Sequence, residues 1–146
     1  MEKDEKITSI ISSFREVDKF FYKQMWHHAN ELGVTLVQLR ILKLISKKPN
    51  LSLQELTEKM EINKSTVSAT VDRLVKASYI MREQSTIDRR AIVLNLTVLG
   101  NEKEKEGHEL FYKRLHGLND ISDEDVKSLL KLHQLVKEKM NVNGDE

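Results

Sequence analysis

The stretch INKSTVSATVDRLVKASYIMREQSTIDRRAIVLNLTVLG, residues 62–100, decides the fold. Its first part predicts a helix from Lys64 to about Ala77, because apolar residues at helical spacing share one side. These residues are Val67, Val71 and Leu74. Two β-rich runs follow, Tyr79–Gln84 and Ala91–Leu96, with six residues between them that end in two arginines. The stretch therefore predicts a helix followed by a β-hairpin with a basic tip.

A shorter helix is predicted directly before this stretch. Ser52 and Glu55 form an S-x-x-E capping box, in which each side chain satisfies an unpaired backbone N–H at a helix start. This helix runs to about Lys59, and after the three residues 61–63 the pattern restarts with Asn63 as the next cap. Two helices joined by so short a turn form a helix–turn–helix unit.

Long helices are predicted at both ends of the chain. The first has apolar residues every three or four positions and ends at Gly33. They are Ile7, Ile11, Phe14, Val17, Phe21 and Met25. Thr35 caps a helix through Lys47, and a charged helix runs from Thr97 to about Leu118. Ser122 opens the last helix, whose stripe is Val126, Leu129, Leu130, His133, Val136 and Met140.

The predicted fold is mainly α with a small β-hairpin: a winged helix–turn–helix with long N- and C-terminal helices. With 146 residues, the chain suits one single-domain protomer. It contains no cysteine, which excludes disulfides and thiol chemistry. No apolar run approaches the length of a membrane span and the start lacks a signal-peptide pattern, so a cytoplasmic location without a membrane partner is expected.

The outer face of the helix that begins at Lys64 is small, polar and basic. Short side chains allow close approach to base edges, and hydroxyl and guanidinium groups donate hydrogen bonds in a major groove. The residues expected there are Lys64, Ser65, Thr66, Ser68, Ala69 and Arg73. Asp72 lies on the same face and the net charge is only +1. A winged helix used for protein contact, with no role on DNA, therefore stays open as the alternative.

The tip of the predicted hairpin carries Asp88, Arg89 and Arg90. An arginine on a thin loop can enter a minor groove, where the narrow walls concentrate negative potential, and the carboxylate two residues earlier can hold it extended. Arg82, in the first strand, is expected to add to this basic surface. The predicted partner is double-stranded DNA.

Residues 62–100, with the D-x-R wing at Asp88–Arg90 and the L-T-x-x-G start of the next helix, resemble the MarR family of bacterial winged-helix regulators. The resemblance implies a DNA-binding lobe over 35–98 and a homodimer clamped by helices in 1–32 and 99–146. It further implies binding to a pseudo-palindromic operator, usually as a repressor relieved by a small-molecule effector. By position, Arg90 is the minor-groove residue.

The sequence departs from the family pattern at two points. Ser78 stands where the family usually has Gly after the recognition helix, so we expect a strained left-handed backbone there or a different helix end. The peroxide-sensing cysteine is missing, which excludes the chemistry of that branch.

An effector pocket is placed near the end of the first helix, at Tyr22, Met25, Trp26 and His27, although such an aromatic group is also typical of plain core. The expected effector is aromatic or amphipathic. No His-x-x-x-His pair occurs, so neither a metal nor another cofactor is expected. Catalytic motifs are also missing, and the chain is not expected to be an enzyme. The operator, the regulated genes and the direction of regulation are not encoded in these patterns.

Overall fold

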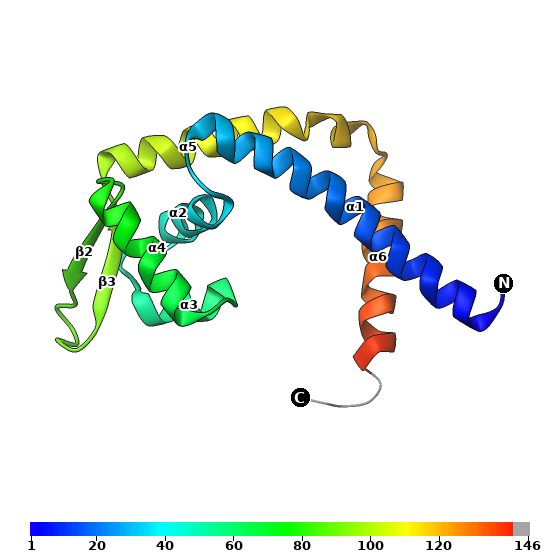
Figure 1. Ribbon diagram of the computed structural model, residues 1–146, viewed down its shortest axis with the longest axis horizontal. Coiled ribbons are helices and arrows are strands. Elements are labelled where there is room, and N and C mark those ends of the chain that lie inside the picture. Colours follow the sequence, from blue (N-terminus) through cyan, green and yellow to red (C-terminus); the bar gives the residue numbers. More distant parts are fainter. Residues whose placement is uncertain (142–146) are drawn as a thin grey trace. The chain divides into compact units, whose positions relative to one another are not determined.

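The computed structural model describes residues 1–141 (Figure 1). The described helices are α1 (Lys3–Leu32), α2 (Leu36–Lys47), α3 (Leu53–Met60), α4 (Lys64–Lys76), α5 (Val98–Arg114), a 3₁₀ helix (His116–Asp120) and α6 (Asp123–Met140). The strands are β1 (Leu51–Ser52), β2 (Ile80–Gln84) and β3 (Ile92–Leu96). This order confirms the predicted mainly helical winged helix–turn–helix. The last five residues of the predicted segment 99–146 lie outside the described part.

Contacts divide the chain into one compact unit, Met1–Tyr112, and a second that begins at Lys113. The whole expected DNA-binding lobe, 35–98, lies in the first unit. Its role as a separate lobe of a dimer stays a prediction. No helix within residues 1–141 is long and apolar enough to cross a membrane.

Side-chain caps set the helix starts where the sequence predicts them. Thr35 Oγ1 accepts from the backbone N–H of Gln38 at 3.1 Å, and Gln38 Oε1 accepts from the N–H of Thr35 at 2.9 Å. Ser52 Oγ accepts from the N–H of Glu55 at 3.0 Å. The Glu55 carboxylate also pairs with the Lys48 ammonium, and this hydrogen bond is the main reason that the pKa of Glu55 lies below its ordinary value.

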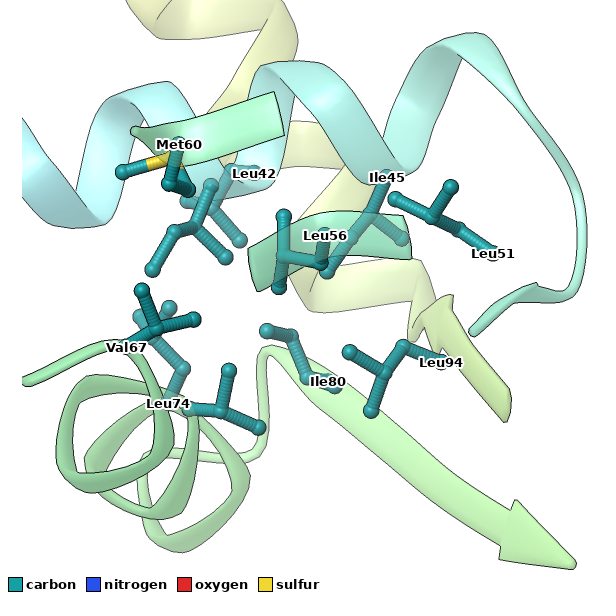
Figure 2. Packing of buried hydrophobic residues seen from close by; sticks show 11 residues of the cluster. Leu42, Ile45, Leu51, Leu56, Met60, Val67, Leu74, Ile80 and Leu94 are labelled. Carbon is teal, nitrogen blue, oxygen red and sulfur yellow. The ribbon is translucent and has the colours of Figure 1, made fainter. Parts of the chain in front are cut away.

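The hydrophobic core lies in the lobe formed by α2, α3, α4 and the sheet (Figure 2). The three predicted inward residues of α4 are 0–1% exposed. They meet residues from every neighbouring element, namely Ile41, Leu42, Ile45, Leu51, Leu56, Met60, Ile80 and Leu94. Burial of this one face of α4 fixes which residues point outward, because a helix turns about 100° per residue.

The sheet has three strands in the order β1-β3-β2, whereas the sequence predicted a two-stranded hairpin. Leu51 of β1 pairs with Leu94 of β3, and Ile80 of β2 pairs with Leu96. A strand of two residues has no alternating pattern to read, and its partner lies far along the chain. The third strand was therefore missed, although it anchors the start of α3 to the middle of the hairpin.

The predicted helix from Thr97 to about Leu118 is shorter than expected. Thr97 Oγ1 accepts from the N–H of Gly100 at 2.9 Å, which confirms the start, but α5 ends at Arg114. A 3₁₀ helix that contains Gly117 follows it. Glycine disfavours helix continuation because it loses more backbone freedom than other residues.

Ser78 adopts the strained left-handed backbone expected of it, with φ of +64°. Its N–H donates to the carbonyl of Val75 at 3.0 Å, and the N–H of Tyr79 donates to the carbonyl of Leu74 at 2.9 Å. These two bonds form a Schellman motif, which normally places glycine at this position. The motif turns the chain from α4 into β2.

The apolar stripes of α1 and α6 face solvent. Exposed fractions in the N-terminal part of α1 run from 40% at Ile10 to 67% at Val17. In α6, Leu129 is 48% exposed and Leu130 is 61% exposed. Single exposed apolar residues are normal on a protein surface, but two whole helix stripes need a partner surface.

Candidate nucleic-acid interface

Helix α4 presents its polar face to solvent. Ser68 is half-buried, and the other predicted residues of this face are exposed, namely Lys64, Ser65, Thr66, Ala69 and Arg73. Asn63 Oδ1 accepts from the N–H of Ser65 at 2.8 Å and also from its hydroxyl. The Ser65 proton is thus already used in the helix cap, so Ser65 can offer a ligand its oxygen as an acceptor. Thr66 and Ser68 are the better-placed hydroxyl groups for donating hydrogen bonds.

The tip of the β2–β3 hairpin is braced by its own side chains. Asp88 Oδ1 accepts from the backbone N–H of Arg90 at 3.0 Å and from its Nε at 3.4 Å. The Arg90 side chain is nevertheless 93% exposed, so its guanidinium remains open to a ligand. This is the geometry expected of a carboxylate that holds an arginine in place. Arg89 is also exposed, and its carbonyl oxygen accepts from Gln84 Nε2.

Arg82 does not lie alone on β2 but forms an ion pair with Asp72 of α4. The pair joins β2 to α4, and these two elements lie side by side in Figure 1. An exposed ion pair stabilises a protein by less than about 1 kcal/mol, so its main effect is on charge. The negative charge of Asp72, which disfavours a nucleic-acid surface, is therefore balanced by the positive charge of Arg82. Arg82 stays a predicted DNA contact, but part of its charge is already matched.

A surface hollow brings together parts of the chain that the sequence analysis treated separately. Lys64 at the start of α4 and Arg90 at the hairpin tip both line it, together with Gln54 and Thr57 of α3. The two α3 residues were missed as candidate contacts. Gln54 is exposed and lies about 200° around α3 from the core residue Leu56, so the helical period could have marked it as outward-facing. Thr57 is half-buried and lies about 100° from Leu56, so the period did not mark it. The hollow makes α3, α4 and the wing one continuous surface.

The four candidate pocket residues on α1 do not converge on one space. Met25 lines a cavity of about 260 Å³, whereas Tyr22 and Trp26 line a different hollow beside Val34. His27 lines neither and lies edge-on to Trp26, with ring centroids 5.3 Å apart. Neighbouring residues of a helix point about 100° apart, whereas residues three or four positions apart face the same side, as Tyr22 and Trp26 do here.

The Met25 cavity lies between α1, α2 and α5, and most of its lining residues were not predicted from the sequence. His28, three residues after Met25, is buried and faces Phe111 of α5. Lys43 Nζ lies 5.6 Å from the centroid of the Phe111 ring. The cavity thus combines aromatic and apolar walls with two cationic side chains, Arg40 and Lys43, and one carboxylate, that of Glu104.

The sequence matches the model of the MarR family over residues 34–92. The HTH-type transcriptional repressor MdtR of Bacillus subtilis is 33% identical over 103 residues, which are 70% of this chain and 66% of that repressor. Two solved structures share the fold. A cysteine-to-serine mutant of MarR from E. coli, complexed with operator DNA, has a TM-score of 0.77 at 20% identity, over 93% of this chain and 99% of that one. MarR from Staphylococcus aureus, in complex with salicylate and kanamycin, has a TM-score of 0.80 at 21% identity, over 93% of each chain.

Proposed function

This chain belongs to the MarR family of winged-helix transcriptional regulators, and from this premise we propose that it binds a pseudo-palindromic operator as a homodimer and represses transcription. The observation that carries the proposal is the guanidinium of Arg90, 93% exposed on a braced hairpin tip beside the open polar face of α4. A helix fits the major groove and an arginine fits the adjacent minor groove. The family comprises transcriptional regulators rather than enzymes.

Charge placement supports DNA over a protein partner. Asp72 is paired with Arg82. The hollow beside the start of α4 is lined by two cationic side chains, Lys64 and Arg90, and one acidic side chain, Glu58. Phosphates on either side of a groove would meet these cations, while the uncharged Thr66, Ser68 and Ala69 would face the bases. A protein-contact surface has no need for such a division between cationic edges and a small polar centre.

Binding to duplex DNA is expected to weaken steeply with salt. Each phosphate neutralised by a lysine or arginine releases counterions, so the logarithm of the binding constant falls linearly with the logarithm of the salt concentration. Titration of a duplex enriched from a random library by the protein itself, at two salt concentrations, measures this slope. Absence of a salt-dependent complex would favour the protein-contact module instead.

We expect the full-length chain to be a dimer. Pairing between two copies would cover the exposed stripes of α1 and α6, and this burial is the main driving force for such an association. Sedimentation equilibrium should give twice the chain mass of 17.0 kDa. A folded monomer at micromolar concentration would contradict this expectation. The twofold symmetry of the dimer predicts two half-sites roughly 10 base pairs apart.

The Met25 cavity is the candidate effector site. We expect salicylate to bind there, because Lys43 can pair with a carboxylate beside the Phe111 ring. A ligand that releases DNA must favour the unbound spacing of the two wing lobes, with a coupling of about 1–3 kcal/mol. Lys43→Ala should weaken salicylate binding measured by calorimetry, and the control Lys47→Ala, one turn further along α2, should not. Equal affinities for the two variants would place the effector elsewhere.

A further inference from the structure

Ile87 stands at the tip of the β2–β3 hairpin with its side chain 97% exposed. Among the large apolar side chains of residues 1–141, none is more exposed. It lies outside the α1 and α6 stripes and has no core role. A single exposed isoleucine is normal on a protein surface, so its exposure alone does not assign Ile87 a partner. Its place on the wing, three residues from the exposed Arg90, makes it a candidate contact.

Hydrogen bonds within the loop fix the backbone at Ile87. Ser85 Oγ accepts from the backbone N–H of Ile87 at 3.2 Å and from that of Asp88 at 3.3 Å. The N–H of Ser85 donates to the carbonyl of Ala91 at 2.9 Å, which closes the base of the loop. A loop braced in this way loses little conformational entropy on binding, so the residues at its tip are preorganised to contact a ligand.

Ile87 and Arg90 leave the same loop three residues apart, one apolar and one cationic. If Arg90 enters a minor groove, the tip of the loop that carries Ile87 lies at that groove, whose walls are deoxyribose edges with apolar carbon atoms. Apolar side chains of minor-groove proteins commonly pack into this groove or wedge between base steps.

We infer that Ile87 is a second minor-groove contact, which packs against the deoxyribose wall beside Arg90. This inference rests on the proposed binding of DNA. Arg90 supplies the electrostatic attraction, and Ile87 adds an apolar contact that is insensitive to salt. Together they make the affinity of the wing for DNA depend on the width of the minor groove. Only a narrow groove brings both of its walls within reach of the two side chains.

The test compares Ile87→Ala with Arg90→Ala on a duplex enriched from a random library by the wild-type protein. Ile87→Ala should weaken binding about fivefold to tenfold, the loss expected for one partly buried isoleucine, with the salt slope unchanged. Arg90→Ala should weaken binding and reduce the slope by about one. Ile87→Leu should bind like wild type, and so should Thr86→Ala, the control at the neighbouring exposed position.

The outcomes separate this inference from the proposed function. If the wild-type protein binds the duplex but Ile87→Ala binds equally well, the inference fails and the proposed function stands. If Ile87→Ala also changes the salt slope, the substitution has moved Arg90 and the apolar contact is disproved. If Ile87→Ala instead changes the sedimentation mass, Ile87 contacts a second copy of the chain. A wild-type protein that binds no duplex overturns the proposed function itself.

Discussion

Replacing Arg90 with alanine is expected to weaken operator binding by about 1–3 kcal/mol, or roughly 5- to 150-fold, and to leave the fold intact. The side chain is 93% exposed and its contacts within the chain are those to Asp88, so its removal opens no cavity. The loss comes from the minor groove, where a guanidinium meets concentrated negative potential. Fluorescence anisotropy on the enriched duplex measures the affinity, and thermal unfolding checks the fold.

Two further variants separate the role of the Arg90 guanidinium from that of its charge alone and from that of α4. Arg90→Lys keeps the charge but loses the planar fork, so it should restore only part of the affinity. Arg73→Ala, on the outer face of α4, should instead relax the preference between the enriched duplex and random DNA. If Arg90→Ala bound both duplexes as the wild type does, the assignment of the wing would be wrong.

Gly100→Ala is expected to lower the free energy of unfolding by about 3 kcal/mol or more, at the upper end of overpacking effects. A β carbon at position 100 would lie 2.0 Å from the carbonyl oxygen of Tyr79, and backbone cannot move aside as a flexible side chain can. The same carbonyl oxygen accepts from the N–H of Thr97 at 3.1 Å, and Thr97 Oγ1 donates to the carbonyl of Ser78 at 2.5 Å. Moving the start of α5 away from Ser78 and Tyr79 to relieve the clash would break both hydrogen bonds.

Two other glycines among the described residues, Gly107 and Gly117, provide graded controls. A β carbon at Gly117 would meet nothing within 4 Å, so Gly117→Ala should change stability by no more than about 0.5 kcal/mol. At Gly107 it would approach Leu39 Cδ2 to 3.1 Å, and that side chain can yield. Urea unfolding should therefore rank Gly100→Ala as the least stable of the three. Equal midpoints for Gly100→Ala and Gly117→Ala would contradict the close approach.

Local interactions explain why so much of the lobe was predictable. A cap such as Thr35 or Asn63 bonds to a residue two or three positions ahead, and a helical stripe repeats within each turn. The same reasoning predicted the buried and exposed faces of α4. Asp88 and Arg90, two residues apart, also needed no tertiary information to be paired.

Long-range contacts decided the features that the sequence did not reveal. The strand β1 exists because Leu51 pairs with Leu94, and a two-residue segment carries no pattern of its own. Likewise, Asp72 gains its partner only when β2 folds back along α4 and brings Arg82 to it. Neither contact can be predicted from the spacing of residues along the sequence.

In helix α1, too, the sequence suggested candidate pocket residues, but tertiary packing decided which of them line the cavity. Aromatic composition at the end of α1 suggested that Trp26 and Met25 share a site, but only packing against α2 and α5 determines which side of α1 is enclosed. Met25 turned inward toward Phe111 and Lys43, and Trp26 turned toward another surface. The sequence by itself determined the helices, their caps and the wing, because these depend on neighbours along the chain. The third strand, the charge balance of the outer face of α4 and the cavity depend on residues that only the tertiary structure brings together.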